Sequence, residues 1–274
     1  MKSILIVLVL ITVTMCSREG ENEDLRGWDV RLFKNTPVWE TAKAIENGDT
    51  LRIRELLKGK PYELLNYQEK KFGQSLLQWA VYAGHLPGVR VLAELGADPN
   101  LKSNDSTNAI IQAANRYETS AYLEILIKHG GDVNSVANID AAQHLRTPLM
   151  AAAKSLNNVK LLIEAGANAN YVDTTSGRQS ALQYAFYSDN IDIINYLILE
   201  VGVDYKGVFN VTLNGDSLYI SDMLRKLPYP LESEEYRKKM LLVSFLNKNG
   251  IDYWKSPVPR HYYNIYDSVY LNKY

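Results

Sequence analysis

The side chains that most often perform chemistry are few and scattered in this 274-residue chain. Cys16 is the only cysteine, so neither an intrachain disulfide nor a cysteine-rich zinc site can form. The histidines lie far apart, at positions 85, 129, 144 and 261. The sequence lacks a Gly-x-Ser-x-Gly nucleophile turn, a His-Glu-x-x-His metal motif and a glycine-rich phosphate loop. We therefore expect a protein that binds without catalysis and needs no metal or cofactor.

Cys16 lies at the end of an apolar N-terminal segment. Lys2 precedes a run from Ile4 to Met15 in which every residue is aliphatic, Thr or Met. A membrane-spanning helix needs ~20 apolar residues, and this shorter run is typical of a secretory signal peptide. The residues that follow Cys16 are rich in Glu. Residues 16–37 are therefore predicted to be a polar, solvated tether.

The residues around Cys16 resemble the lipobox of bacterial lipoproteins, here Val13-Thr14-Met15-Cys16. The resemblance implies that residues 1–15 are a signal peptide cleaved before Cys16, whose sulfur then receives a lipid such as palmitate. Because Ser17 follows, it also implies a periplasmic protein anchored in the outer membrane. Met15 departs from the pattern, in which a small residue precedes the cysteine. The alternatives are an unmodified cysteine after an ordinary signal, or an unexported form that starts at Met15.

Composition narrows the function of the remaining chain. The net charge is −1, which gives no electrostatic basis for binding nucleic acid. Hydrophobic residues make up 46% of the chain, a fraction typical of a folded globular protein.

Four stretches of the sequence repeat one pattern, at intervals of 33, 39 and 33 residues. Each opens with a residue that can cap a helix N-terminus, and each has an alanine five residues later, where a neighbouring helix could approach closely. The stretches are SLLQWAVYAGH from Ser75, NAIIQAANRYE from Asn108, TPLMAAAKSLN from Thr147 and SALQYAFYSDN from Ser180. Downstream of each, an aliphatic segment ends in glycine, which can adopt the left-handed conformation that stops a helix. Two short helices and a turn, repeated about every 33 residues, predict a solenoid.

The repeated residues resemble the ankyrin-repeat family. Thr147-Pro148-Leu149 matches its opening triplet, Gly84-His85 its central pair, and Gly96-Ala97-Asp98-Pro99-Asn100 its closing run. With two divergent terminal units, the resemblance implies an all-α ankyrin-repeat solenoid of about six helix-turn-helix repeats over residues 38–255. It also implies hairpin fingers between the repeats and a structural role for His85. Residues 256–274 would form a tyrosine-rich C-terminal tail.

Two of the predicted fingers are longer than the regular spacing requires. The finger Ser135–Arg146 has five extra residues, and the next finger has two. Insertions in solenoids often map to the binding face, although neutral loop growth is the alternative.

Ankyrin arrays generally bind other proteins through a concave face made of fingers and first helices. Aligning the motifs places a set of polar and aromatic residues on that face, where Tyr and Arg are enriched at energetic hot spots. The predicted partner-binding residues are Tyr82, Asn104, Asn115, Arg116, His144, Lys154, Tyr171, Arg178 and Tyr187. An ordinary solvated surface is the alternative for this set.

The C-terminal stretch from Asp252 to Tyr274 contains one tryptophan and many tyrosines, and Pro257 and Pro259 interrupt any helix. We expect these aromatic residues to fold back over the last repeat as a cap. A docking segment for a partner is the alternative.

Together these features predict a monomeric, membrane-tethered periplasmic module that binds a protein. Some exported ankyrin lipoproteins resemble immunity proteins, which neutralise lipase toxins delivered by a type VI secretion system. The sequence therefore suggests such an inhibitor, with a lipase effector as its partner. Support of a periplasmic enzyme such as catalase is the second binding function. An enzyme without a recognisable motif is the third possibility, but the repeats leave no room for a catalytic domain.

Overall fold

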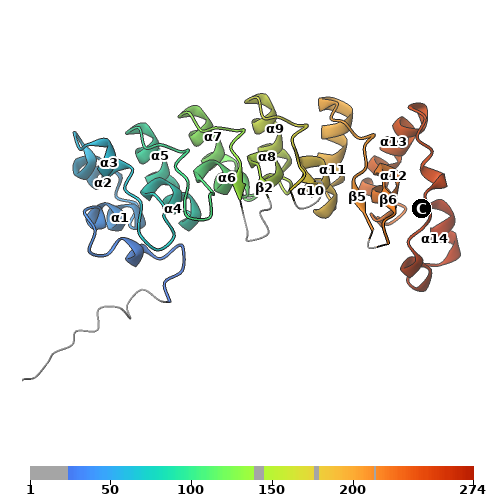
Figure 1. The fold of residues 1–274 in the computed structure, drawn as a ribbon, viewed down its shortest axis with the longest axis horizontal. Coiled ribbons are helices and arrows are strands. Elements are labelled where there is room, and N and C mark those ends of the chain that lie inside the picture. The colour runs from blue at the N-terminus through green and yellow to red at the C-terminus, as the bar shows by residue number, and fades with distance from the viewer. Residues whose placement is uncertain (1–23, 139–144, 176–178, 213) are drawn as a thin grey trace, which may run out of the picture.

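The computed structural model describes residues 24–138, 145–175, 179–212 and 214–274. In these residues, six pairs of antiparallel helices lie side by side in one elongated row (Figure 1). The first helices of the pairs form one layer and the second helices form the other. In chain order the pairs are α1 (Trp39–Glu46) with α2 (Thr50–Leu57), α4 (Leu76–Ala83) with α5 (Leu86–Glu94), α6 (Ala109–Ala114) with α7 (Ala121–Lys128), α8 (Pro148–Ala151) with α9 (Leu156–Glu164), α10 (Ala181–Tyr187) with α11 (Ile191–Asn195), and α12 (Ile220–Arg225) with α13 (Glu234–Lys248). The predicted all-α solenoid of about six repeats is confirmed.

Short elements complete the row. A single helical turn, α3 (Tyr62–Leu65), follows the first pair, and the π-helix η2 (Tyr196–Val201) continues α11. One 3₁₀ helix, η1 (Val30–Phe33), precedes the first pair. After the last pair come η3 (Tyr253–Lys255), η4 (Arg260–Asn264) and α14 (Ser268–Lys273).

The first helices begin where the sequence pattern places their caps. The side chains of Ser75, Asn108, Thr147 and Ser180 each accept a hydrogen bond from the backbone N–H three residues later, at 3.1–3.3 Å. The alanines five residues after the caps are buried, and α4, α6, α8 and α10 pack on one another in that order. Small buried side chains therefore allow these helices to pack closely, as expected.

Asparagine side chains join the turn of each central repeat to the turn of the next. Asn100 Oδ1 accepts from the backbone N–H of Asp132 at 2.7 Å, and Asn134 Oδ1 accepts from that of Asn168 at the same distance. Asn66 and Asn170 make the equivalent bond at 2.8 and 2.9 Å. The first five repeats are thus linked in series by the same kind of side-chain amide, and we call these four bonds the asparagine ladder.

The fingers connect one pair of helices to the next. Three contain antiparallel hairpins: β1 (Ala137–Asn138) with β2 (Leu145–Arg146), β3 (Val172–Asp173) with β4 (Gln179–Ser180), and β5 (Asn210–Val211) with β6 (Ser217–Leu218). In the long finger, Ala137 pairs with Arg146 and Asn138 with Leu145. These hairpins lie along one side of the row (Figure 1).

The N-terminal segment differs from the expected polar tether. Residues 24–37 are folded against the first two repeats rather than extended in solvent. Leu25, Leu32 and Phe33 are buried, and the Phe33 ring makes an edge-on contact with Trp79 at 5.4 Å between centroids. Burial of these apolar side chains outweighs the polar character of the surrounding sequence, so the folded unit begins by Leu25.

The tyrosine-rich tail covers the last pair of helices, as the cap interpretation predicted. Tyr253, Tyr262 and Tyr274 are buried against α12 and α13. Tyr262 donates its hydroxyl hydrogen bond to the carbonyl of Lys226 at 3.0 Å. We refer to Tyr253–Tyr274 as the C-terminal cap.

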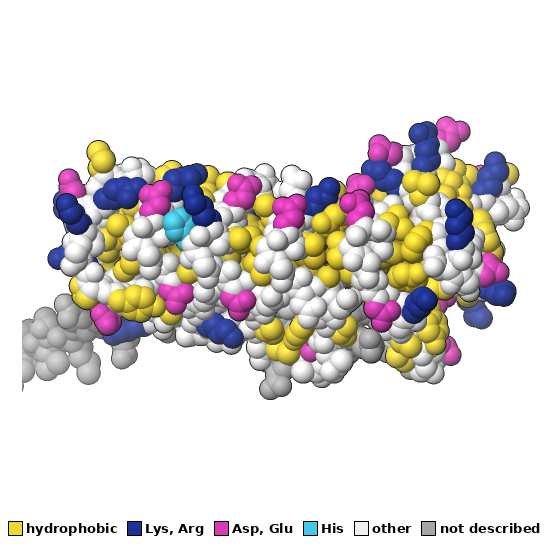
Figure 2. Space-filling model, turned by 90° about the horizontal axis from the view of Figure 1, so that it is seen from above, with side chains coloured by type: hydrophobic (Ala, Val, Ile, Leu, Met, Phe, Trp, Pro, Cys, Tyr) yellow, Lys and Arg dark blue, Asp and Glu magenta, His cyan; other side chains and the backbone are white. Residues whose placement is uncertain are grey.

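The face of the row formed by the second helices carries charged side chains of both signs (Figure 2). Figure 2 shows Lys or Arg side chains beside Asp or Glu side chains along this face, with hydrophobic atoms between them. Among the described residues, the helices are all too short or too polar to cross a membrane.

Candidate functional site

The ends of the first helices and the fingers beside them form the candidate binding surface, which we call the groove. Tyr82 lies near the C-terminus of α4, and Tyr187 is the last residue of α10. Their side chains are 45% and 52% exposed, although large aromatic side chains are usually buried. Asn115 and Lys154 are also exposed, just after α6 and α8. These four residues occupy equivalent positions in successive repeats, so they form one row along the groove.

Arg116 has a structural role that the sequence did not reveal. Its guanidinium donates a hydrogen bond to the carbonyl of Val81 at 3.0 Å, near the end of α4. It also lies over the Tyr122 ring, 4.7 Å from its centroid. A cation near the last carbonyls of a helix satisfies acceptors that the helix leaves free. Arg116 therefore ties the third repeat to the second, and its contact with a partner stays a prediction.

Asn104 also ties neighbouring elements together. Its side-chain amide donates to the carbonyl of Lys71 at 3.1 Å, and its backbone N–H donates to that of Phe72 at 2.8 Å. Gly73 lies opposite with φ +71°, and a Cβ there would be 2.5 Å from Asn104 Oδ1. Only glycine fits this approach, so the first two fingers are held in fixed relative positions.

Tyr171 lines a crevice of about 250 Å³ between the third and fourth repeats, together with Asn134 and Thr147. Burial raises the pKa of its hydroxyl above the ordinary value, and the nearby Asp173 carboxylate adds to the effect. Its hydroxyl is therefore neutral at physiological pH.

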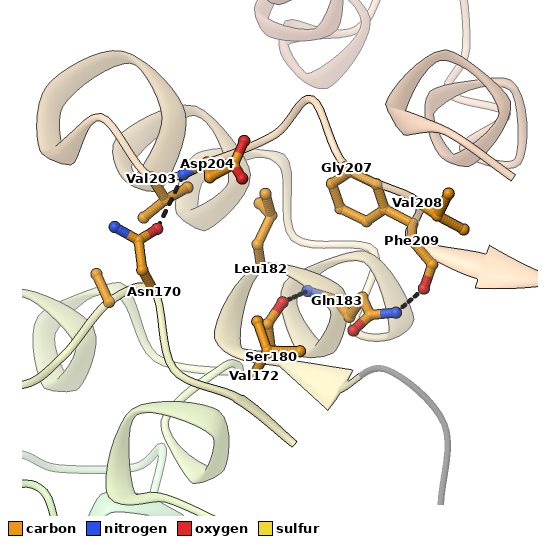
Figure 3. Close-up of a pocket in the computed structure, with 11 residues that line it drawn as sticks. Asn170, Val172, Ser180, Leu182, Gln183, Val203, Asp204, Gly207, Val208 and Phe209 are labelled. Carbon is orange, nitrogen blue, oxygen red and sulfur yellow. Dashed lines mark hydrogen bonds between the residues drawn. The ribbon is translucent and has the colours of Figure 1, made fainter. Parts of the chain in front are cut away.

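The equivalent crevice one repeat further along has a volume of about 120 Å³ (Figure 3). Figure 3 shows that its polar groups bond to one another: Asn170 to the Asp204 backbone, and Gln183 to both Ser180 and the Phe209 carbonyl. Because these groups already have partners, the crevice is a joint between repeats rather than an open ligand site.

Three predicted site residues lie outside the described residues. They are the lipidation candidate Cys16 and the finger residues His144 and Arg178. Their roles stay predictions.

Trp28 is an exposed aromatic residue that the sequence reasoning missed, because it falls in the segment assigned to the tether. Its side chain is 56% exposed, and its ring lies 6.2 Å from that of Tyr82, centroid to centroid. Its position four residues after the acidic stretch gave no indication that it would join the groove. The only signal was the apolar spacing of Leu25, Leu32 and Phe33, which indicates packing on a core.

The described residues provide no evident catalytic arrangement. No group of three His, Cys, Asp or Glu side chains among them could hold a metal ion. His85 lies 5.2 Å from the Trp79 ring, and burial lowers its pKa below the ordinary value. Asp98 and Asp132 each accept a hydrogen bond from the backbone N–H two residues later, at 2.8 and 2.9 Å, so both carboxylates stabilise turns of the repeats. The fold and this surface together define a repeat solenoid that acts as a protein-interaction module.

Family models identify the repeats directly. Residues 72–104 match the model for a single ankyrin repeat, and residues 110–207 match a model for three ankyrin repeats. These matches identify residues 72–104 and 110–207 as ankyrin repeats, and the flanking helix pairs continue the same solenoid.

Curated relatives share the repeats but differ widely in length. Protein PhlB of Serratia liquefaciens is 28% identical over 169 residues, which cover 62% of this chain and 69% of PhlB. Palmitoyltransferase AKR1 of Kluyveromyces lactis is 25% identical over 179 residues, 65% of this chain and 24% of the relative. The nuclear factor NF-kappa-B p105 subunit of Gallus gallus is 27% identical over 191 residues, 64% of this chain and 19% of the relative. The chain thus spans about a quarter of AKR1 and a fifth of p105.

Proposed function

We propose that this protein is an exported, lipid-anchored inhibitor, which binds a secreted lipase toxin in its groove and has no catalytic activity of its own. The observation that carries the proposal is the exposure of three aromatic side chains along the groove, Trp28 and Tyr82 at its N-terminal end and Tyr187 three repeats further along. Exposed aromatic residues on a fixed scaffold bind with little loss of side-chain entropy, and they are enriched at hot spots.

The proposed location rests on the N-terminal sequence. The apolar run, Lys2 and the lipobox-like residues before Cys16 support export and lipidation, and Ser17 supports the outer membrane. A tethered inhibitor would remain in the periplasm, where a lipase toxin meets its phospholipid substrate. The chain would act as a monomer that gains one protein partner.

The test of inhibition is survival in co-culture with a neighbour that delivers a lipase effector. A Tyr82→Ala/Tyr187→Ala variant should fold normally, because both side chains are exposed, and should leave cells as sensitive as a gene deletion. Removal of an aromatic hot spot typically costs ~2 kcal/mol or more, roughly 30-fold in affinity. Tyr263→Ala is the matched control, because Tyr263 is 63% exposed but lies in the C-terminal cap.

The outcomes separate the proposal from the second binding function. If deletion of the gene leaves survival unchanged, the inhibitor proposal is wrong. Loss of a periplasmic enzyme activity in the same deletion strain would then favour support of an exported enzyme. Lipidation is tested by Cys16→Ala, which should abolish labelling with a fatty acid and release the protein into the soluble periplasmic fraction.

A further inference from the structure

A hollow of about 550 Å³ lies at the N-terminal end of the groove. One wall is the segment Asp24–Trp28, and the other consists of Lys71 and Phe72 on the first finger and Tyr82 on α4. The segment precedes the six helix pairs, so the repeats alone would leave this end of the groove open.

The added wall is held in place by specific contacts. Leu25 is buried, and its carbonyl accepts a hydrogen bond from Lys71 Nζ at 3.0 Å. Gly27 passes so near α4 that a Cβ there would lie 2.9 Å from the Tyr82 ring. Because these contacts fix the segment Asp24–Trp28 in the free protein, its backbone loses little conformational entropy when a partner binds.

Two aromatic rings border this hollow, and both are accessible. The Trp28 and Tyr82 rings are 6.2 Å apart and inclined at 43°, and about half of each side chain is exposed. Trp and Tyr are the residues most enriched at interface hot spots. An apolar side chain of a partner could contact both rings at once.

Positive charge lies beside the aromatic pair. Arg26 and Lys71 line the hollow, and the exposed Lys70 is the neighbour of Lys71 in the chain. The face over the second helices differs, since Figure 2 shows charges of both signs along it.

The nearby carboxylates offset this charge only in part. Glu69 is buried and accepts the backbone N–H groups of Lys71 and Phe72 at 2.7 and 2.9 Å. Asp105 accepts from Ser103 and Thr107 at 2.6 and 2.7 Å. Asp24 is an exposed carboxylate in the lining. Among the residues that line the hollow, the cations Arg26 and Lys71 therefore outnumber the single carboxylate, Asp24.

We propose that the hollow binds an acidic segment of the protein partner, with one aromatic or long aliphatic side chain between carboxylates. The apolar side chain contacts Trp28 and Tyr82, and the carboxylates pair with Arg26 and Lys70. This inference rests on the proposed function, since it assigns part of the partner's contact to the same groove. Trp28 is then a specificity-determining residue outside the repeats.

The experiment selects random dodecapeptides displayed on phage against the purified protein, and measures the affinity of the enriched peptides by fluorescence anisotropy. The selected sequences should be acidic and contain a Trp, Phe, Tyr or Leu. Trp28→Ala should weaken their binding about 10- to 30-fold. Arg26→Glu/Lys70→Glu should do so by a similar factor, and the effect of these charges should decrease in high salt. The matched controls Tyr263→Ala and Lys248→Glu remove an exposed tyrosine and reverse an exposed charge at the far end, and should leave binding unchanged.

Several outcomes would overturn the proposal. These are enrichment of basic or uncharged peptides, failure to enrich any, or equal binding to Trp28→Ala when its melting temperature matches the wild type. Dimerisation that Trp28→Ala abolishes would assign the hollow to a second copy of the chain instead. Peptide selection needs no knowledge of the toxin. Acidic peptides that bind through Trp28 would therefore support this inference even if co-culture shows no protection.

Discussion

The central repeats and the C-terminal cap are held together by different interactions. Between central repeats, the asparagine ladder places one short side chain at each joint, with both bonding partners in the backbone and close to solvent. Beneath the cap, the side chains of Arg225 and Lys239 from the last helix pair are buried among tyrosine rings. The first arrangement can be repeated indefinitely, whereas the second closes the row.

Aromatic faces and carbonyl oxygens surround the side chains of Arg225 on α12 and Lys239 on α13. The Arg225 guanidinium lies 4.1 Å from the centroid of Tyr253 and donates to the main-chain carbonyl of Tyr274, whose hydroxyl donates to the carbonyl of Arg225. Lys239 Nζ lies 3.7 Å from the Tyr274 centroid and donates to the carbonyl of Leu227 at 3.1 Å. Burial lowers the pKa of Lys239 to about 6, and the nearby Arg225 charge adds to the shift. The cap thus covers a lysine of α13 that is neutral at physiological pH.

The two regions therefore differ in which interactions stabilise the fold. A central joint depends on close packing, with modest hydrogen bonds that any similar repeat could form. Beneath the cap, burial of the polar side chains of Arg225 and Lys239 costs desolvation free energy, so replacing such a group by an apolar one can stabilise the fold. Substitutions should therefore act in opposite directions in the two regions.

The largest expected effect is in the central repeats. Ala152 is 1% exposed at the end of α8, so Ala152→Arg forces a long charged side chain into close packing. We expect a loss of about 4 kcal/mol or more in the free energy of unfolding, measured by denaturant titration. Ala165→Arg is the control, because Ala165 is exposed at the end of α9. Equal stability of the two variants would contradict the packing described here.

Beneath the cap, by contrast, Lys239→Met should stabilise the protein at pH 7. The methionine keeps most of the apolar contacts and removes a group that must lose its proton to be buried. A gain of about 1–4 kcal/mol in the free energy of unfolding is expected. Lys248→Met, an exposed position on the same helix, should have little effect. A loss of stability in Lys239→Met would show that the cation–ring contacts outweigh desolvation.

The same lysine makes stability depend on pH. The unfolded chain keeps Lys239 protonated up to about pH 10.4, whereas the folded protein releases that proton above about pH 6. Between these values the unfolded state binds more protons, so stability rises with pH and falls as pH decreases toward 6. From pH 7 to 8.5, wild type should gain about 1.4 kcal/mol per pH unit relative to Lys239→Met. Parallel pH profiles would mean that Lys239 stays charged in the fold.

The sequence predicted the central region well because its interactions recur at fixed spacing. Caps, buried alanines and turn glycines each involve residues within one repeat, so the pattern of one unit predicts all the others. The glycines at 96, 130, 166 and 202 have φ between +76° and +89°, as a helix-ending glycine requires. The repeat count and the exposure of Tyr82 and Tyr187 followed from the same alignment.

The two ends could not be predicted to the same depth, because their contacts join residues far apart without a period. The tyrosine content of the tail indicated a cap, but not that Arg225 and Lys239 would be enclosed by it. Nothing in the spacing indicated that Trp28 would lie beside Tyr82, or that Arg116 would bond to the carbonyl of Val81. Such contacts depend on how the chain turns in three dimensions.

Removing a single bond pair of the asparagine ladder should lower the free energy of unfolding by less than the Ala152→Arg substitution. Asn134→Ala removes the bond from the Asn168 N–H at 2.7 Å and the bond to the Gly166 carbonyl at 3.1 Å. Both lie near solvent, where water can replace the lost partners, so about 1 kcal/mol of the free energy of unfolding should be lost. Asn157→Ala, an exposed asparagine on α9, should cost less. Equal losses would show that the ladder adds nothing to ordinary surface effects.

The smallest effect is expected where the repeats meet the last helix pair. Lys238 on α13 forms ion pairs of 2.7 Å with Asp192 on α11 and with Glu234 one turn earlier, and all three side chains are partly or largely exposed. Water and salt screen such pairs, so Lys238→Met should destabilise the protein less than Asn134→Ala. The backbone of the same residue still accepts a hydrogen bond from Asn195 Nδ2 at 3.1 Å, which the substitution leaves in place. Denaturant titrations at 0.05 M and 1 M salt should show the difference from wild type shrinking as salt rises. If it persists at 1 M salt, the side chain of Lys238 contributes by packing, and this joint resembles the cap more than the ladder.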